Sequence, residues 1–200
     1  MNNNPNRPSD AEIVRQVVAG NVNAFEHLFK RYQNYVLGIL KKHLPYSQVR
    51  DVAQDVFIRT YQSLLNYKGE SPFDQWLSTI AVRACYDFWR KNYKSKELSL
   101  GSFTERHQVW LEETLSDESS QSFQERGLQK EAREILDWAL DRLSAEDRMV
   151  VELIYLEGHS VKETAQLFGW SMANVKVRSF RSRRKLHQIL SKQLDKRGKL

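Results

Sequence analysis

The sequence predicts an all-α protein with two small helical domains joined by a flexible acidic linker. Apolar residues recur every three or four positions along most of the chain, and no alternating strand pattern or internal repeat interrupts them. Capping residues and glycines divide this periodicity into separate helices. The charge divides the chain too, because residues 97–175 carry 7 Lys/Arg against 16 Asp/Glu, whereas the regions before and after them are basic.

The composition excludes several classes of protein. Apolar residues make up 40% of the chain and charged residues 28%, a balance typical of globular proteins. The single cysteine, Cys85, precludes an internal disulfide and suits a reducing compartment, so we expect a cytoplasmic protein. No apolar run is long enough for membrane insertion, and the polar start does not resemble a signal peptide. The scattered histidines and lone cysteine predict no metal site, and we expect no cofactor.

Two helices open the first domain, which we place at residues 9–95. Ser9 and Glu12 form a capping box at the start of a short helix. Asn23 and Glu26 are expected to cap a longer helix, which carries a continuous apolar stripe.

Two further helices complete the core of this domain. One runs from about residue 47 to residue 67. Ser71 and Pro72 open the other, as N-cap and first helical residue, and its periodicity continues unbroken through Tyr93. The core residues expected on these two helices are Val52, Val56, Phe57, Tyr61, Leu64, Leu65, Phe73, Trp76, Leu77, Ile80, Ala81, Ala84, Cys85 and Phe88.

Residues 96–125 interrupt the helical pattern. They carry few apolar side chains and an excess of acidic ones, which predicts a linker. The pattern returns in a second domain at 126–194. One helix there ends before Ser144, and Ser144 caps another that runs to Gly158.

The last two helices have the proportions of a helix-turn-helix. Ser160 and Glu163 form a second capping box, the short helix closes at Gly169, and Ser171 caps a long basic helix. The spacing divides that long helix into an inward stripe and an outward face. The inward stripe is Val175, Ser179, Ser182, Leu186 and Ile189. The outward face is Lys176, Val177, Phe180, Arg181 and Arg184, flanked by Arg178, Arg183 and Lys185.

This outward face suits duplex DNA. Val177 and Phe180 can contact thymine methyl groups, while arginines can reach guanine or phosphate. Residues 176–200 carry 10 Lys/Arg against 1 Asp/Glu, which attracts a polyanion. The alternative is a helical hairpin with a solvated basic tail, which leaves two apolar residues on a cationic face unexplained.

A second candidate surface lies on the third helix. Asp51, Gln54, Asp55 and Ile58 occupy positions i, i+3, i+4 and i+7, away from the core stripe. An acidic stripe with an apolar centre would repel DNA and fits a basic helix of a protein partner. A merely solvated face fits the composition equally well. A metal-dependent nuclease fits less well, because no third acid or histidine accompanies the two aspartates.

A third candidate surface combines aromatic rings and cations. The loop before the fourth helix carries Tyr67 and Lys68 beside a glycine. The end of that helix carries Arg83, Tyr86, Asp87, Trp89, Arg90, Lys91, Tyr93 and Lys94. Unpaired bases stack on rings while their phosphates meet cations, so the pattern favours single-stranded DNA. The alternative is that Trp89 and Tyr93 only close the core, as we expect of Trp76.

Together these motifs resemble bacterial sigma factors of the extracytoplasmic-function (ECF) group, within the sigma-70 family. Residues 51–57, DVAQDVF, resemble the region 2 signature, and residues 76–81, WLSTIA, resemble the tryptophan-containing helix that follows it. Residues 143–148 (LSAEDR), 155–160 (YLEGHS) and 174–178 (NVKVR) resemble region 4. The motifs occur in the family's order.

The resemblance implies a factor that directs core RNA polymerase to promoters and opens the DNA. By this resemblance, a coiled coil of the largest polymerase subunit is bound by four residues of this chain, Asp51, Gln54, Asp55 and Ile58. The resemblance assigns to the −10 element and its single strand Tyr67, Lys68, Arg83, Tyr86, Asp87 and Arg90. It assigns to the −35 element Lys176, Val177, Arg178, Phe180, Arg181, Arg183 and Arg184. It also implies that an anti-sigma factor holds the protein inactive.

Two positions depart from the family pattern. Arg83 stands where family members often carry Asn, which bears on the preference for the flipped base. Val177 stands where they often carry Ser, which bears on −35 specificity.

The predicted function is therefore that of a sigma factor, and we expect no enzymatic activity. The first alternative is a helix-turn-helix regulator that binds duplex DNA without polymerase, which leaves the Asp51 stripe and the aromatic loop unexplained. The second is a nucleic-acid enzyme, for which the sequence offers no metal or nucleophile constellation.

Overall fold

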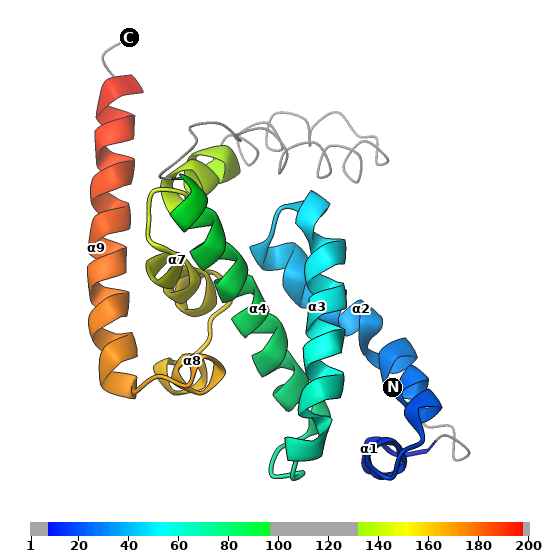
Figure 1. Ribbon diagram of the computed structural model, residues 1–200. Helices are drawn as coiled ribbons and strands as arrows, with labels where there is room; N and C mark the ends of the chain where they lie inside the picture. The colour runs from blue at the N-terminus through cyan, green and yellow to red at the C-terminus, as the bar shows by residue number, and fades with distance from the viewer. Residues whose placement is uncertain (1–7, 97–131, 198–200) are drawn as a thin grey trace, which may run out of the picture. The chain divides into compact units, whose positions relative to one another are not determined.

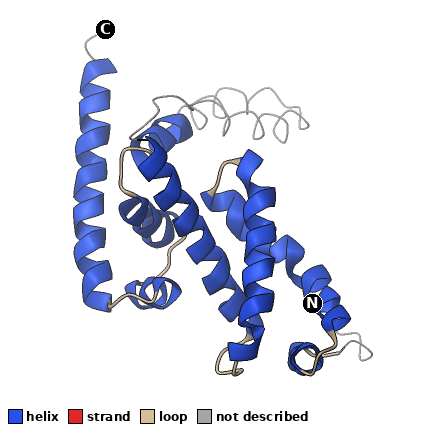
Figure 2. Cartoon of the chain, viewed as in Figure 1, coloured by secondary structure: helices blue, strands red, loops and turns tan. Residues whose placement is uncertain are grey.

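The computed structural model describes residues 8–96 and 132–197, and every regular element in those ranges is helical (Figures 1 and 2). The predicted all-α fold is confirmed for this part of the chain. The linker expected at 96–125 lies outside the described residues from position 97 onward. Contacts group the chain into two units, Met1–Cys85 and Tyr86–Leu200, which divide within one helix.

Within residues 8–85, the first unit contains four helices, the last of them only in part, and two short 3₁₀ turns. They are α1 (Asp10–Val18), η1 (Val22–Ala24), α2 (Phe25–His43), α3 (Tyr46–Ser63), η2 (Leu64–Asn66) and the first part of α4 (Phe73–Lys96). α2 and α3 pack along each other, and α1 packs on α2. Fully buried core residues include Leu28, Val36, Leu40, Val56, Leu77 and Ala81.

The capping box predicted for α1 is present. The Ser9 hydroxyl accepts a hydrogen bond from the Glu12 backbone N–H at 3.3 Å, and the Glu12 carboxylate accepts one from the Ser9 backbone N–H at 2.7 Å. Ile13, Val14 and Val17 then form the buried face of the helix. The cap thus sets where α1 begins, and the apolar spacing sets which face it buries.

The cap predicted at Asn23 is wrong. Asn23 lies inside η1, α2 begins at Phe25, and its N-cap residue, Ala24, offers no side-chain hydrogen bond. A helical backbone at residues 22–24 leaves no extended residue from which a side chain can bridge back to the first turn. Glu26 instead pairs with Lys30 on the exposed surface of α2.

Two residues predicted in the core are exposed. Tyr61 is 39% exposed and Leu65 is 73% exposed. Leu65 follows the end of α3 and belongs to η2, where each residue turns about 120° rather than about 100°, so the apolar phase of α3 does not continue to it. Trp76 is half-buried, and its ring lies 4.9 Å from the ring of Tyr67, centroid to centroid.

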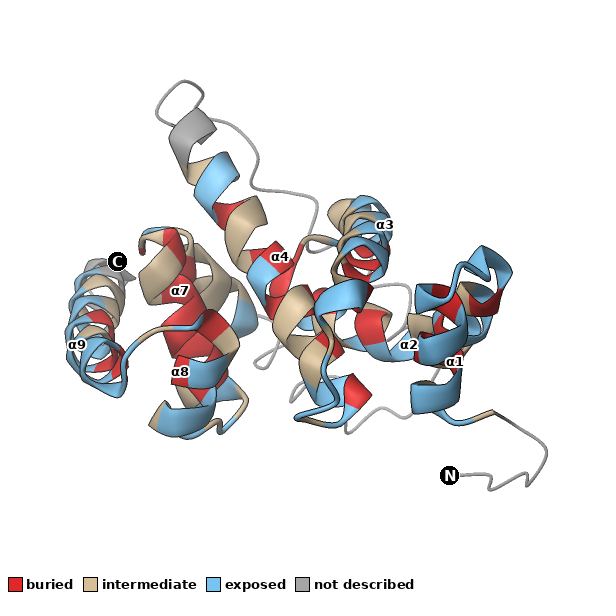
Figure 3. Cartoon of the chain, turned by 60° about the horizontal axis from the view of Figure 1, so that its bottom comes forward, coloured by how far each residue is buried: buried red, intermediate tan, exposed pale blue. Residues whose placement is uncertain are grey.

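The second unit combines the end of α4 with the C-terminal helices. These are a helix over 132–140, α7 (Ala145–Val151), a π-helical turn η3 (Glu152–Leu156), α8 (Val161–Phe168) and α9 (Met172–Arg197). Leu140, Leu143 and Val151 form a buried cluster, and Leu186 and Ile189 of α9 pack against it. In Figure 3, α7 is mostly buried, whereas the outward turns of α9 are exposed.

A fully buried arginine organises this unit. The Arg148 guanidinium donates to the Glu152 carboxylate at 2.8 Å, pairs with Asp141, and lies 3.8 Å from the centre of the Trp89 ring. Two carboxylates and an aromatic face offset the cost of burying the charge. Trp89 therefore contributes to packing in the second unit.

Candidate polymerase and DNA interfaces

The helix-turn-helix begins with a well-capped α8. The Ser160 backbone N–H donates to the Glu163 carboxylate at 2.7 Å, and the Glu163 backbone N–H donates to the Ser160 hydroxyl at 3.2 Å. The hydrogen bond from the Ser160 backbone N–H to the Glu163 carboxylate is the largest cause that lowers the pKa of this carboxyl. Gly169 ends the helix with φ +69°, a left-handed conformation that glycine adopts without strain.

The inward stripe of α9 lies where the spacing predicts. Val175, Ser179 and Ser182 are buried. The Ser179 and Tyr155 hydroxyls are hydrogen-bonded at 2.8 Å, and the Ser182 hydroxyl donates to the Arg178 carbonyl at 2.7 Å. Small hydroxyl residues at these positions let α9 approach its neighbours closely while every buried hydroxyl keeps a partner. This packing fixes the rotation of α9 about its axis.

The outward face of α9 is consequently presented to solvent. Val177 is 50% exposed and Phe180 is 69% exposed, and Lys176, Arg181 and Arg184 are exposed around them. Exposure of two apolar side chains on a stable helix costs solvation free energy in the free protein. That arrangement is typical of a face that contacts base edges as well as phosphates.

The flanking arginines of this face, unlike the central ones, contact other residues of the second unit. Arg178 donates to the Asp147 carboxylate at 3.0 Å and lies 5.4 Å from the centre of the Trp170 ring, which itself stacks on Phe168. Arg183 lies 5.9 Å from the centre of the Tyr155 ring. Arg178 therefore already has an internal partner that ties α9 to α7. The sequence pattern missed this role, because Asp147 lies 31 positions earlier in the chain.

The acidic stripe on α3 faces away from the core. Asp51 and Gln54 are exposed and Ile58 is 47% exposed. Asp55 is half-buried and pairs with Arg59 at 2.8 Å. The structure thus presents all four predicted residues at the surface of one helix, with an exposed apolar side chain at one end.

Exposed aromatic residues of α2 and α3 were not identified from the sequence. Phe29 is exposed although its ring contacts that of Phe57 with centroids 4.8 Å apart, and the ring of Tyr61 lies 5.3 Å from that of Phe25. Their positions on predicted apolar stripes indicated burial. An apolar stripe can be wider than the surface that the neighbouring helix covers. The packing of α2 on α3 therefore decides which residues of each stripe stay exposed at its edge.

The loop between η2 and α4 is held by an aromatic cluster. The Tyr67 hydroxyl donates to the Ser71 carbonyl at 2.7 Å, which closes the loop, and Gly69 at φ +73° allows the turn. The Tyr67 ring is edge-on to Phe73 at 5.5 Å. Lys68 is exposed beside it, and Arg83 is exposed on α4.

The remaining residues predicted for single-stranded DNA lie at the end of α4, within the second unit. The Tyr86 hydroxyl donates to Glu146 at 3.0 Å, and burial followed by this contact raises the pKa of Tyr86. Asp87 and Arg90 form an ion pair at 3.6 Å, and the Arg90 guanidinium lies 5.9 Å from the Tyr86 ring centre. The hydroxyl of Tyr86 is thus engaged by a carboxylate, unlike the side chain of Lys68.

The described residues contain no metal site or membrane span. No group of three or more His, Cys, Asp or Glu side chains within residues 8–96 and 132–197 is placed to hold a metal ion. None of the helices in these ranges is long and apolar enough to cross a bilayer.

The two parts of the chain match two models of one protein family. Residues 28–95 match Sigma-70 region 2, and residues 133–186 match Sigma-70, region 4. The ECF RNA polymerase sigma-E factor of Escherichia coli (strain K12) is 30% identical over 181 residues, covering 88% of this chain and 91% of the relative. That of Haemophilus influenzae is 28% identical over 177 residues, covering 88% and 92%.

Two solved structures share the fold. CnrH, solved in complex with the cytosolic domain of CnrY, has a TM-score of 0.51 at 24% identity and covers 90% of this chain and 95% of its own. RpoE of Bartonella quintana, solved with the anti-sigma factor NepR, has a TM-score of 0.50 at 20% identity and covers 84% and 96%.

The helical units and the order of the two matched regions define the class, a protein built from sigma-70 regions 2 and 4. This chain belongs to the ECF group of RNA polymerase sigma factors within that family. It therefore acts in transcription initiation, by directing polymerase to promoters.

Proposed function

We propose that this sigma factor uses three separate surfaces. The stripe of Asp51, Gln54, Asp55 and Ile58 docks on core polymerase. The set of Tyr67, Lys68, Arg83, Tyr86, Asp87 and Arg90 binds the −10 element as it opens. The set of Lys176, Val177, Arg178, Phe180, Arg181, Arg183 and Arg184 binds the −35 element. The first two surfaces belong to a domain that we place at residues 9–95, and the third belongs to a domain at residues 126–194.

The observation that carries the proposal is the outward face of α9. Val177 and Phe180 are exposed among Lys176, Arg181 and Arg184, and among the described residues none of those three cations has an ion-pair partner. Unpaired cations are available to phosphates and guanine, and the apolar pair is available to thymine methyl groups.

The α3 stripe supports a protein partner. The two carboxylates of the stripe oppose the approach of DNA, and the exposed Ile58 offers an apolar contact that a protein interface can bury. A helix with basic residues at matching spacing, such as one strand of a coiled coil, complements this surface.

The Tyr67 loop supports contact with an unpaired base. The Tyr67 ring is half-buried, so part of it stays accessible, and Lys68 beside it can meet the backbone phosphate. Removing a base from the duplex costs a few kcal/mol, which stacking on a prepared ring helps to offset.

We further propose that the chain is cytoplasmic, catalyses no reaction itself and is controlled by an anti-sigma factor. RNA polymerase and promoter DNA are cytoplasmic in bacteria, and none of the helices in the described ranges can cross a membrane. Both similar structures were solved as complexes, one with the cytosolic domain of CnrY and the other with a protein named an anti-sigma factor.

Transcription in vitro tests the proposed function. Core polymerase alone and core polymerase with this chain are supplied with a fragmented library of the source genome, and the RNA 5′ ends are mapped by sequencing. We expect starts that appear only with the chain and share elements near −10 and −35. Duplex binding without any new starts would favour the helix-turn-helix regulator instead.

A further inference from the structure

We propose that α1 positions the base-capturing loop, and that Tyr32 of α2, hydrogen-bonded to Asp10, is the residue through which it does so. The inference rests on the proposed role of Tyr67 in taking up an unpaired base. All the residues concerned lie in the first unit.

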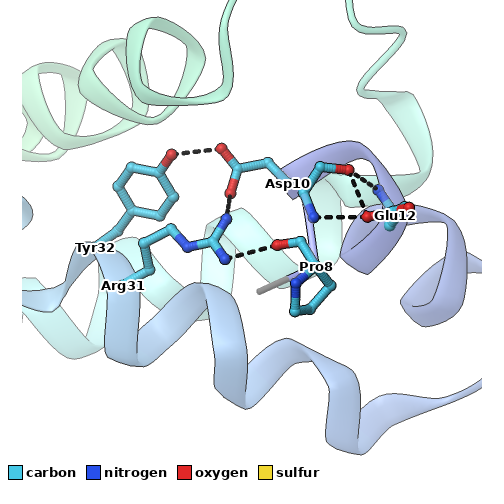
Figure 4. A network of polar contacts seen from close by, with 6 residues as sticks. Pro8, Asp10, Glu12, Arg31 and Tyr32 are labelled. Atoms are coloured by element: carbon cyan, nitrogen blue, oxygen red, sulfur yellow. Dashed lines mark hydrogen bonds and ion pairs between the residues drawn. The ribbon is translucent and has the colours of Figure 1, made fainter. Parts of the chain in front are cut away.

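Asp10 joins α1 firmly to α2. One oxygen of its carboxylate accepts a hydrogen bond from the Tyr32 hydroxyl at 2.6 Å, and the other pairs with Arg31 (Figure 4). The same Arg31 guanidinium donates to the Pro8 carbonyl at 2.7 Å. The capping box sets the first turn of α1 directly beside this network. Asp10 is therefore bound to two consecutive residues of α2, Arg31 and Tyr32.

Tyr32 connects that network to the loop. Its ring lies 5.2 Å from the ring of Phe73, which is buried, and Phe73 in turn meets Tyr67 edge-on at 5.5 Å. Trp76 lies 4.9 Å from Tyr67 and 5.5 Å from Phe73, completing the cluster. Only the ring of Phe73 separates Tyr32 from Tyr67.

The electrostatics agree with this geometry. Burial is the largest cause that raises the pKa of Tyr67, and the Asp10 carboxylate is the next. Burial and Asp10 also raise the pKa of Tyr32. Both phenols therefore stay protonated at neutral pH, so the Tyr32 hydroxyl can donate to Asp10 and the Tyr67 hydroxyl to Ser71.

The loop depends on contacts made by its side chains, because it has no helical hydrogen-bond pattern to hold it. Residues 67–72 form no helix, and the Tyr67–Ser71 bond spans only the loop itself. A ring that is already in place when the base leaves the duplex loses less conformational entropy on stacking. Loosening the support should consequently slow DNA opening without weakening the docking of polymerase or of α9.

The decisive variant is Tyr32→Phe, which removes the hydrogen bond to Asp10 and keeps the ring against Phe73. Holoenzyme is assembled on a promoter carrying 2-aminopurine at the flipped position, and the rate of fluorescence increase reports opening. We expect a roughly threefold to tenfold slower rate, the range that one lost hydrogen bond supplies. Core polymerase affinity and binding to a −35 duplex should stay unchanged. Tyr46→Phe, at an exposed tyrosine at the start of α3, is the matched control and should open at the normal rate.

A double variant separates positioning from simple stability. If Tyr32 acts through Tyr67, then Tyr32→Phe combined with Tyr67→Ala should open no more slowly than Tyr67→Ala alone. Independent, additive losses, or normal opening by Tyr32→Phe, would overturn the inference and leave the role of Tyr67 intact. Normal opening by Tyr67→Ala would overturn the role of Tyr67 and, with it, the inference.

Discussion

The exposed faces of α3 and α9 both combine apolar with charged side chains, but their charges have opposite signs. Each is a helical surface with apolar side chains among charged ones, Ile58 on α3 and Val177 with Phe180 on α9. The charged members of the α3 stripe are the carboxylates of Asp51 and Asp55, whereas those around Phe180 are cations. Exposed apolar residues indicate that a helix face binds something, and the sign of the surrounding charge indicates what.

The two faces also differ in whether their charged side chains form ion pairs within the protein. Asp55 already pairs with Arg59 on its own helix. Within the described residues, Arg181 and Arg184 make no such pair. A face that binds a folded protein can keep part of its charge paired, because shape and apolar contact supply specificity. A face that binds phosphates gains affinity from every unpaired cation.

The largest effect is expected from reversing the charge on α3. Asp51→Arg with Asp55→Arg should weaken binding to core polymerase by about 100-fold or more, because like charges brought together across an interface cost several kcal/mol. Fluorescence anisotropy of the labelled chain titrated with core polymerase measures this loss. The −35 duplex should bind with normal or slightly higher affinity.

Glu26→Arg is the control for that double variant. Glu26 is an exposed acid on α2 outside the stripe, and the substitution makes the same kind of charge reversal. Glu26→Arg changes the net charge by two units and the double variant changes it by four. A loss of polymerase binding free energy in Glu26→Arg of about half that in the double variant would therefore make the loss a matter of net charge and give the α3 stripe no special role.

The second prediction compares two arginines of α9. Arg181→Ala should weaken binding of a specific −35 duplex by roughly 1–3 kcal/mol, while a scrambled duplex changes less. Arg178→Ala should instead lower the thermal stability of the second unit, because Arg178 ties α9 to Asp147 of α7. Equal losses on both duplexes for Arg181→Ala would make that residue a phosphate contact.

The third prediction concerns the apolar part of the α9 face. Phe180→Ala should cost roughly 1–2 kcal/mol in −35 binding, the scale expected for burying part of an aromatic side chain. If Phe180 contacts a thymine methyl group, replacing that thymine with uracil should weaken the native chain and leave Phe180→Ala unaffected. A loss from uracil that is the same in both proteins would place the methyl contact elsewhere.

Helical periodicity accounts for much of what could be predicted. The face of α9 was correctly predicted because one apolar spacing runs from Val175 to Ile189, so the phase of the helix is set by several residues at once. The exposure of the α3 stripe follows from the same logic. Both capping boxes were also correctly predicted, since their partners lie three residues apart.

What could not be predicted depends on contacts distant in sequence or on a local change of helix type. Leu65 left the apolar phase because η2 is a 3₁₀ turn, and Asn23 lost its capping role because η1 is another. The burial of Arg148 could not be predicted, because the ring that covers it belongs to Trp89, which lies 59 positions earlier in the chain. Position-by-position roles within the three surfaces remain predictions for the variants above.

The smallest effect tests whether the two faces can be changed independently. Ser160→Ala removes the hydroxyl that caps α8 and should destabilise the second unit by about 1 kcal/mol. Far-UV circular dichroism during urea unfolding measures this change. At urea concentrations below the unfolding transition, this variant should bind −35 DNA as tightly as the native chain. Binding of polymerase through α3 should stay constant.

The same cap predicts a pH dependence that a second variant can isolate. The Ser160 backbone N–H lowers the pKa of Glu163 below its ordinary value of 4.5, so this carboxylate stabilises the folded state above that value. The contribution is lost as the pH falls through the lower folded-state pKa. Glu163→Gln keeps a hydrogen-bond acceptor at this position and cannot titrate. Its unfolding midpoint should therefore fall less than that of the native chain when the pH is lowered from about 5.5 to about 3.5, roughly one unit either side of the ordinary carboxyl pKa. An identical fall in both proteins would show that the cap at Glu163 does not contribute to the acid sensitivity of this unit.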